Sequence, residues 1–407
     1  MRVGVFHPGS QNAWQRAYAF QEVGQLGWFA TSAYFQPDHA PVRLAATVPG
    51  AAGYRLRRQL LKRWFPPLDP ACVRRMGSIE FGELALRRLG LSDAAGRINR
   101  WGNRRFAAPV IELLRREPVD VVWGYNSSSL EVFEWAKRQG LTCVLDQSIG
   151  HPAAENAVLL AERDRHPAFF PPDFAGHDNA WIARNDAELA LADRVIVGSA
   201  AAARTLTERG VPGRKIHVVP YGYDETVFPP PAERPPVRNR PLSVLFVGTV
   251  GARKGMAYLL PAAARLPASI ARITLVGRLD MPTTTFARYA QYVHHVPQIA
   301  RADVLRHFQA ADLFVFPSLF EGGGIVLAEA LGAGLGILQG PESGVGARDG
   351  VDGRVMPRLD AAALADAIAD TARNPAELVA WQAAAREAAA GRRWANFRAG
   401  LRGAMAS

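Results

Sequence analysis

A proline-rich segment divides this chain into two halves that show the same pattern of strands and helices. Six of the fourteen residues from Phe228 to Pro241 are prolines, and proline at this density cannot continue a helix or a central strand. On each side of the segment, short apolar runs alternate with helical segments. Such alternation is typical of a parallel sheet covered by helices. The sequence therefore predicts an α/β protein with two Rossmann-like domains joined by a linker.

Each half contains several expected strands. Those of the first half are Val3–His7, Val119–Tyr125, Thr142–Asp146, Arg194–Gly198 and Lys215–Val219. Those of the second half are Leu242–Gly248, Ile273–Gly277, Tyr292–Val296, Leu313–Pro317 and Gly336–Gly340. Helices are expected near Ala13–Leu26 and Leu130–Gln139, with a helical insertion at Pro152–Glu188. We predict domains at 1–228 and 242–385, a linker at 229–241, and a C-terminal helix within 386–407 that packs back toward the first domain.

The most informative motif follows the expected strand at Leu313–Pro317. Glu321 and three glycines lead directly into an apolar helix that contains Glu329. Backbone N–H groups at such a helix start bind anions, and glycines let a phosphate approach closely. Glu329 lies eight residues after Glu321, at most about 12 Å along a helix. Two carboxylates that hold hydroxyl groups on either side of a diphosphate match the layout of a nucleotide-sugar: a sugar, two phosphates and a ribose.

A second cluster of polar residues follows the expected strand at Leu242–Gly248. Arg253 and Lys254 lie in a glycine-containing turn, and such cations can neutralise a departing diphosphate without a metal. Taken alone, this turn fits an ordinary surface loop equally well. Together with the Glu321 loop it indicates a phosphate site, because ligands of parallel sheets bind at the carboxyl ends of the strands. The chain has no Asp-x-Asp motif, so we expect neither a metal nor a cofactor.

Two histidine-containing segments also follow expected strands. His151 comes after Thr142–Asp146. It is either a structural loop histidine or a group that faces the cleft between the domains, where it would contact the transferring sugar or its acceptor. His294 and His295 precede Val296 in a loop that would border the nucleotide base.

Positive charge is concentrated in one window of the chain, whose net charge is +11. Residues 51–105 contain 13 Arg or Lys and four Asp or Glu, with Trp64 and Phe65 among them. This composition suits an anionic membrane surface or a polyanionic acceptor. The alternative is a solvated, arginine-rich helical face. No nucleic-acid-binding module accompanies the charge, so we expect no nucleic acid partner.

The cysteine content and the termini bear on location. The two cysteines, Cys72 and Cys143, cannot form a disulfide framework, which favours a reducing compartment. The expected strand at Val3–His7 is too short for a signal-peptide core, and no run of 18 apolar residues occurs that could span a membrane. We expect a cytoplasmic protein that associates peripherally with the inner face of the membrane.

These motifs together resemble the family-4 retaining glycosyltransferases, which have the GT-B fold. Glu321 and Glu329 match the family's E-x7-E signature. Four further segments resemble family motifs: Arg184–Ser199, Lys215–Asp224, Ala310–Ser318 and Gly350–Gly353. The resemblance covers roughly residues 180 to 375. It implies two Rossmann-like domains that face an interdomain cleft.

The resemblance also implies roles for individual residues. Glu321 would contact the hydroxyls of the donor sugar and Glu329 the ribose, while Lys254 matches the phosphate-binding lysine. His151 resembles the acceptor-domain histidine near the reacting carbon, and we assign catalysis to His151, Arg253, Lys254 and Glu321. The other donor-binding residues would be Gly248, Thr249, Gly277, Arg278, Val296, Gly322, Gly323, Gly324, Ile325 and Val326. The acceptor loop would be Gly9, Ser10, Gln11 and Asn12.

The chain departs from the family pattern at several of these positions. Thr249 stands where the family often has arginine, and Arg253 would take that role. Gly323 and Val326 stand where an aromatic residue and a proline are common. The acceptor loop lacks the usual double glycine. For this reason the sequence does not identify the acceptor.

The combined prediction is a metal-independent hexosyltransferase that retains the configuration of the sugar. It would move a sugar from a nucleotide diphosphate sugar to a hydroxyl of a saccharide or lipid-linked acceptor, in the synthesis of lipopolysaccharide, exopolysaccharide or another cell-surface glycan. The resemblance implies a front-side displacement. Two alternatives remain: another GT-B enzyme such as a phosphorylase or an epimerase, and a non-catalytic protein that binds nucleotide-sugars.

Overall fold

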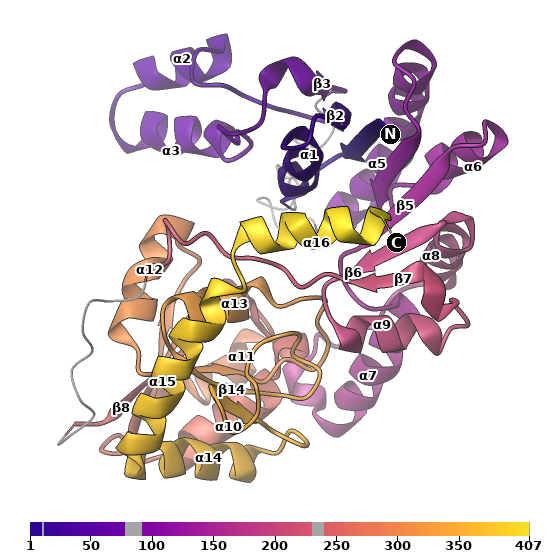
Figure 1. Cartoon of the computed structure of the whole chain (residues 1–407). Helices are drawn as coiled ribbons and strands as arrows, with labels where there is room; N and C mark the ends of the chain where they lie inside the picture. Colours follow the sequence, from indigo (N-terminus) through magenta and orange to yellow (C-terminus); the bar gives the residue numbers. More distant parts are fainter. Residues whose placement is uncertain (10–11, 78–91, 230–239, 407) are drawn as a thin grey trace.

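Two parallel sheets form the centres of two domains in the computed structural model of this chain (Figure 1), which describes residues 1–9, 12–77, 92–229 and 240–406. The first sheet has seven strands in the order β3-β2-β1-β4-β5-β6-β7. The second has six strands in the order β12-β10-β8-β13-β14-β15. Neighbouring strands in both sheets run parallel. The predicted fold class is therefore confirmed.

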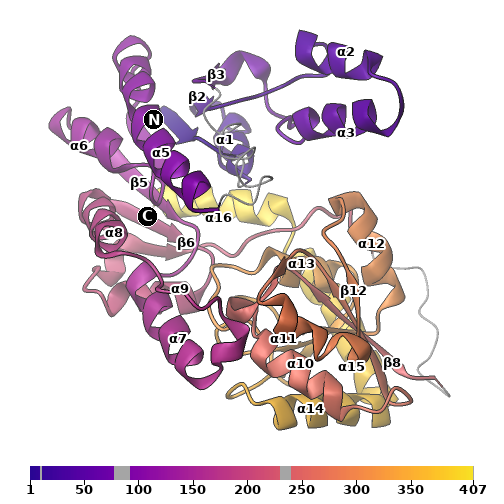
Figure 2. The ribbon, with the colours of Figure 1, turned by 180° about the vertical axis from the view of Figure 1, so that it is seen from behind.

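The first domain contains the elements up to β7. Its strands are β1 (Val3–His7), β2 (Leu26–Thr31), β3 (Val73–Arg75), β4 (Val121–Tyr125), β5 (Thr142–Gln147), β6 (Arg194–Val197) and β7 (Ile216–Val218). Its α-helices are α1 (Ala13–Gln21), α2 (Ala40–Thr47), α3 (Gly50–Leu61), α5 (Ser92–Arg116), α6 (Leu130–Arg138), α7 (Pro152–Arg165), α8 (Asn179–Leu191) and α9 (Ala200–Thr207). Both views show α2 and α3 projecting to one side of this domain (Figure 1, Figure 2).

The second domain begins at β8. Its strands are β8 (Leu242–Val247), β9 (Val250–Gly251), β10 (Ala271–Val276), β11 (Leu279–Asp280), β12 (Val293–Val296), β13 (Leu313–Phe316), β14 (Gly336–Gln339) and β15 (Gly353–Val355). Its helices are η4 (Ala252–Lys254), α10 (Met256–Arg265), α11 (Thr283–Ala287), η5 (Ala290–Tyr292), α12 (Arg301–Ala310), α13 (Ile325–Gly332), α14 (Ala361–Arg373) and α15 (Pro375–Ala390). The short strands β9 and β11 pair with each other.

The central strands are apolar on both faces because helices cover both sides of each sheet. All five residues of β1 are buried. Val3 and Val5 join the core on one side of the sheet, while Phe6 joins the core on the other side. Successive side chains of a strand point to opposite faces, so one strand contributes to two cores. Packing on both faces of the sheet fixes the strands, and with them the loops that follow their carboxyl ends.

The last helix, α16 (Trp394–Ala406), returns to the first domain. Figure 1 shows α16 lying across that domain after α15 has covered the second. Phe397 and Leu401 of α16 share a core with Phe20 of α1. The chain passes between the domains near Tyr223 and again near Arg392, and these two segments are hydrogen-bonded to each other. Tyr223 N donates to Arg392 O at 2.9 Å, and Trp394 N donates to Tyr223 O at 3.2 Å.

The sequence prediction misses the strands β2, β3, β9, β11 and β15, and β2 is the longest of them. We expected a helix through Ala13–Leu26, but α1 ends at Gln21 and Leu26–Thr31 forms β2. Gly24 adopts a left-handed φ of 67°, and Gln25 N returns to Phe20 O at 2.9 Å. A glycine in this conformation is the usual way to end a helix, and Gly24 was the signal that the prediction overlooked.

The predicted domain boundaries stay a prediction. Of the expected linker 229–241, residues 230–239 lie outside the described part of the chain. No helix among the described residues is long and apolar enough to cross a membrane.

Candidate functional site

Glu321 lies between the two predicted cations in the loop that connects β13 to α13. Its carboxylate forms an ion pair with the ammonium of Lys254 and lies 3.7 Å from Nη1 of Arg253. The same Arg253 nitrogen donates to the carbonyl of Phe320 at 2.7 Å. Both cations belong to η4, just after β9. The structure therefore brings together residues that are 67 positions apart in the chain.

Burial and charge act in opposite directions at this cluster. The side chains of Glu321 and Lys254 are only 14% and 12% exposed. Burial by itself would raise the pKa of Glu321, but the charges of Lys254 and Arg253 outweigh it and hold that pKa below its usual value. Burial lowers the pKa of Lys254, against the attraction of Glu321. A carboxylate with two adjacent cations offers acceptors for sugar hydroxyls and donors for phosphate oxygens.

Glu329 lies on α13, the helix that the Glu321 loop enters. Its side chain is 8% exposed and forms an ion pair with Arg301 of α12, which is 49% exposed. Burial raises the pKa of Glu329 to about 7, although Arg301 opposes the shift. Arg301 is also within 5.5 Å of the centre of the Phe228 ring. The sequence did not reveal Arg301 as a partner, because a single arginine at a helix start carries no specific signal.

The raised pKa of Glu329 predicts a pH-dependent affinity for nucleotides. Below about pH 7 the carboxyl holds a proton, and hydrogen bonds to a neutral group are weaker than those to a charged one. We expect the affinity for a nucleoside diphosphate to rise several-fold between pH 6 and pH 8, because the ionised form is the better acceptor for ribose hydroxyls. Calorimetric titration at several pH values measures this.

Two controls isolate the contribution of Glu329. Glu329→Gln is expected to flatten the profile, and so is a 2′,3′-dideoxynucleoside diphosphate, which lacks the hydroxyls. The assignment of Glu329 to the ribose is wrong if the dideoxy ligand shows the same rise as the natural nucleotide.

The glycines of the Glu321 loop pack against the first domain. Ser199 donates its hydroxyl to the carbonyl of Gly322 at 2.5 Å. A Cβ on Gly322 would lie 2.0 Å from the carbonyl oxygen of Ser148, and one on Gly323 would lie 2.5 Å from the ring of Tyr221. Gly324 has a left-handed φ of 63°, which favours glycine. In this structure the glycines thus permit close contact between the domains, while their predicted contact with a diphosphate stays a prediction.

Other predicted donor residues gather at the carboxyl ends of β8, β10 and β12. Gly277 N donates to Val296 O at 2.9 Å, and a Cβ on Gly277 would lie 1.8 Å from the carbonyl oxygen of Gly248. Thr249 follows Gly248 and is half-buried. Arg278 is directed elsewhere, since its guanidinium donates to exposed Asp280 at 2.8 Å. Ile325 and Val326 begin α13 and are half-buried.

His151 is completely buried, and both of its ring nitrogens are bonded. Nδ1 accepts from Ala153 N at 3.1 Å and so caps α7, while Nε2 lies 2.9 Å from Asp186 Oδ1. Its backbone N–H donates to Thr205 at 2.9 Å. These contacts favour the structural interpretation that the sequence left open. The predicted catalytic role of His151 stays a prediction.

The predicted acceptor loop is described only at its ends. Gly9 N donates to Nδ1 of His7 at 2.8 Å. Asn12 precedes α1 in a left-handed conformation with φ of 55°. Ser10 and Gln11 lie outside the described residues.

A buried ion pair behind this loop was not predicted from the sequence. Arg16 of α1 donates to both oxygens of Asp146, at 2.8 Å and 3.1 Å, and the two side chains are 2% and 1% exposed. The guanidinium also lies 5.2 Å from the ring centre of Tyr221. Tyr221 is the ring against which Gly323 packs. The pair thus supports the first-domain surface that contacts the Glu321 loop.

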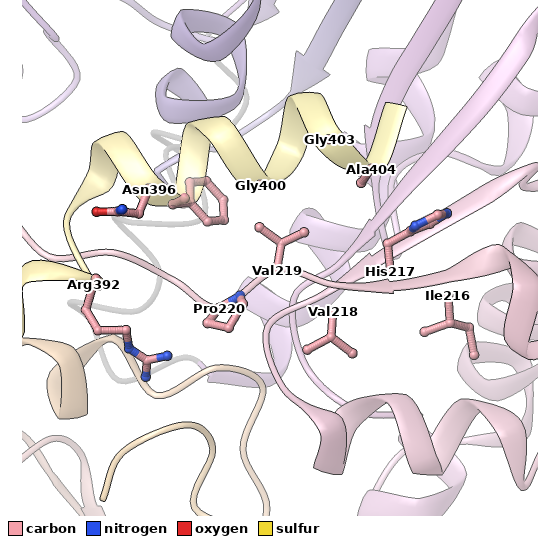
Figure 3. Close-up of a pocket in the computed structure, with 12 residues that line it drawn as sticks. Ile216, His217, Val218, Val219, Pro220, Arg392, Asn396, Gly400, Gly403 and Ala404 are labelled. Atoms are coloured by element: carbon pink, nitrogen blue, oxygen red, sulfur yellow. The ribbon is translucent and has the colours of Figure 1, made fainter. Parts of the chain in front are cut away.

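A separate groove of about 510 Å³ lies between β7 and α16. Figure 3 shows Val219 facing Gly400 of α16, with His217 and Arg392 toward opposite ends. None of the predicted donor or acceptor residues lines this groove. It is therefore distinct from the site around Glu321.

Sequence profiles of known families match most of the chain. The profile "Glycosyl transferase 4-like domain" matches residues 64–222, and the profile "Glycosyl transferases group 1" matches residues 241–374. The two matches fall on the two domains and include Glu321, Glu329 and Lys254. The chain belongs to the family-4 glycosyltransferases.

Named relatives of this glycosyltransferase chain match part of it. D-inositol 3-phosphate glycosyltransferase 1 of Catenulispora acidiphila is 28% identical over 60% of this chain and 61% of that protein. D-inositol 3-phosphate glycosyltransferase of Mycobacterium tuberculosis is 32% identical over 49% of this chain and 45% of that protein. The matches thus span about half the length of these curated relatives.

Solved structures resemble this glycosyltransferase chain over its whole length. Sucrose-phosphate synthase of Thermosynechococcus elongatus has a TM-score of 0.68 at 19% identity, covering 100% of this chain and 98% of that one. WaaG, a glycosyltransferase involved in lipopolysaccharide biosynthesis, has a TM-score of 0.60 at 17% identity, with coverage of 99% and 98%. HepE of Anabaena in complex with UDP-glucose has a TM-score of 0.63 at 14% identity, with coverage of 100% and 99%. These likenesses confirm the GT-B fold.

Proposed function

We propose that this protein transfers a sugar from a nucleoside diphosphate sugar to a hydroxyl acceptor and retains the configuration of the sugar. The observation that carries the proposal is the half-buried cluster of Glu321, Lys254 and Arg253 beside the start of α13. Glu329 lies on the same helix. Carboxylates for hydroxyls and cations for phosphates thus surround one helix N-terminus, which itself favours anions.

The proposed reaction breaks the bond between the anomeric carbon and the phosphate oxygen. The acceptor oxygen forms a new bond to that carbon on the same face, and its proton passes to the departing phosphate. Lys254 and Arg253 stabilise the charge that develops on the diphosphate, so we propose that no metal ion or other cofactor takes part.

The donor is tested by a thermal-shift screen of nucleoside diphosphates and their sugars. HepE was solved with UDP-glucose, which makes UDP-sugars the first compounds to include. A transferase should gain stability with the correct donor, as any ligand that binds only the folded state stabilises it. It should also release the nucleoside diphosphate when acceptor is added.

Measurement of donor turnover with and without a hydroxyl acceptor separates the alternatives. A phosphorylase or an epimerase would turn the sugar over without any hydroxyl acceptor, by phosphate-dependent cleavage or by a change at one carbon. A non-catalytic protein would bind the donor and leave it intact. Either result would remove the transferase proposal.

We also propose a role in the synthesis of a cell-surface glycan at a membrane, in the cytoplasm. The supporting feature is the α2–α3 pair, which presents Leu44, Tyr54 and Leu56 with exposed fractions of 69%, 65% and 49%. Arg43, Arg55 and Arg57 are exposed on the same two helices. Apolar and cationic side chains on one projecting unit suit the interface of an anionic bilayer.

This role predicts binding to anionic vesicles. Each exposed cation contributes about 1 kcal/mol at an anionic surface. Replacing Arg43, Arg55 and Arg57 by glutamine should therefore lower the partition onto phosphatidylglycerol-containing vesicles about 100-fold at low salt. Sedimentation with vesicles measures this, and phosphatidylcholine vesicles should bind neither form.

A matched control removes the same charge elsewhere. Arg116, Arg138 and Arg373 are exposed and lie outside α2 and α3, so their replacement by glutamine should leave the partition nearly unchanged. An equal loss in both triple variants would show that only net charge matters and would remove the membrane role of α2–α3.

A further inference from the structure

Two adjoining cavities lie beside the carboxyl ends of β4 and β5 in the first domain. Each has a volume of about 90 Å³. Asn126, Glu155 and His177 line the first cavity, and Arg104 and Arg184 line the second. Ser127 and Trp181 line both. The indole of Trp181 is therefore a wall common to the two cavities.

The position of Trp181 is held by its neighbours. It lies in the first turn of α8, where the side chain of Asp178 accepts from Trp181 N at 2.8 Å. The imidazole of His177 stacks on the indole, with ring centres 6.1 Å apart and an interplanar angle of 14°. The indole is half-buried. A fixed, partly exposed aromatic ring offers a broad apolar surface with little loss of side-chain entropy on binding. The C–H face of a sugar ring fits such a surface.

The first cavity is connected to the Glu321 cluster by charged contacts. The carboxylate of Glu155 lies 3.1 Å from Nε2 of His177 and 3.8 Å from Nε of Arg253. Arg253 in turn lies 3.7 Å from Glu321. The side chain of Glu155 is only 12% exposed. A hydroxyl group bound beside Glu155 would therefore be separated from the Glu321 cluster by one guanidinium group, that of Arg253.

The cavities also offer hydrogen-bonding groups of the kind that a saccharide needs. Asn126 accepts from the backbone and the hydroxyl of Ser148 through its amide oxygen, at 3.2 Å and 2.9 Å. Its amide nitrogen donates to none of the residues that the structure describes. Apolar walls with a few fixed polar groups are typical of small-molecule sites.

We propose that the paired cavities form the acceptor site, in which a saccharide ring lies against Trp181 and its reacting hydroxyl lies at Glu155. This inference rests on the proposed function and places the acceptor at residues outside the Gly9–Asn12 loop. Trp181 is a specificity-determining residue for saccharide acceptors, and the donor does not touch it.

The test uses the 407-residue chain, a nucleoside diphosphate sugar that this chain hydrolyses slowly, and a series of methyl hexosides as acceptor probes. Release of nucleoside diphosphate is followed as the concentration of each methyl hexoside is raised. At least one methyl hexoside should stimulate release in a saturable way. Trp181→Ala should raise its half-saturating concentration at least tenfold, while the unstimulated hydrolysis and the donor affinity stay within twofold. Trp181→Phe, which keeps an aromatic ring, should stay within about threefold of the natural protein.

Trp135→Ala is the matched control, because Trp135 is also half-buried but lies on α6 outside both cavities. It should leave the half-saturating concentration unchanged. The inference is overturned if no methyl hexoside stimulates a protein that binds and hydrolyses donor, or if Trp181→Ala leaves half-saturation unchanged. A protein that neither binds nor hydrolyses any donor would instead overturn the proposed function, and the acceptor site with it.

Discussion

Glu321→Gln is expected to lower the rate of sugar transfer at least 100-fold, while the affinity for the nucleoside diphosphate stays within about threefold. Glu321 is the carboxylate that Lys254 and Arg253 hold beside the start of α13. The amide keeps the size of the side chain but removes the charge that orients hydroxyls of the donor sugar and balances the two cations. Removing one preorganised polar group from a transition state typically costs about 3 kcal/mol. Steady-state kinetics and calorimetric titration of the same samples measure the two quantities.

Glu342→Gln is the control for this variant. Glu342 accepts from Arg204 at 2.8 Å in an ion pair between the two domains, and its side chain is 44% exposed. This variant should retain full turnover. The proposed role of Glu321 would be lost if Glu321→Gln also retained full turnover, or if it lost nucleotide affinity to the same extent as rate.

Asp146→Ala is expected to destabilise the protein by about 3 to 5 kcal/mol. Arg16 and Asp146 are almost completely buried, and removal of the carboxylate leaves the guanidinium charge uncompensated inside the first domain. At this size of domain the thermal midpoint should fall by about 10 °C. Denaturant unfolding and differential scanning calorimetry measure the change. Turnover at a temperature well below the midpoint should fall too, because the pair supports Tyr221 and thus the surface against the Glu321 loop.

The double variant Arg16→Met/Asp146→Ala tests whether the lower stability of Asp146→Ala comes from the uncompensated charge of Arg16 or from the lost packing of the Asp146 side chain. A buried ion pair can often be replaced by apolar residues at little cost, so the double variant should be clearly more stable than Asp146→Ala alone. Glu112→Ala removes one partner of an exposed pair with Arg116, and should leave the midpoint unchanged. If the double variant is the less stable of the two, the argument from an unpaired buried charge fails.

Much of the site was predictable because it depends on local order along the chain. Glu321, the glycines and Glu329 form one continuous motif. Lys254 follows β8, the neighbour of β13 in the sheet, after the short strand β9. Parallel strands place their carboxyl ends at one edge, so strand order alone brings these loops close. Helix and strand bounds were predicted well wherever apolar runs were bounded by polar residues. The strand β2 was missed because only four residues separate it from the end of α1, with Gly24 as the sole stop signal.

The partners of the buried charges were not predictable. Arg301 for Glu329, Arg16 for Asp146 and Glu155 for Arg253 are pairs separated by 28, 130 and 98 positions. From the sequence alone, a single charged residue on a helix is expected to face solvent, because its partner lies on a distant element of the fold. His151 shows the opposite case, since its position after a strand suggested chemistry, whereas the structure uses both ring nitrogens to cap α7 and bond Asp186.

By itself the sequence determined two parallel-sheet domains, the Glu321–Glu329 motif that leads into α13, and the excess of basic residues before β4. These depend on periodicity, glycine spacing and charge, which are properties of neighbouring residues. Only the tertiary structure decided that the glycines of the Glu321 loop meet Ser148 and Tyr221 of the other domain, and that Trp181 faces two cavities connected to Arg253 through Glu155. Contacts of this kind arise from the close packing of elements that are distant in sequence. No periodic pattern of residues indicates them.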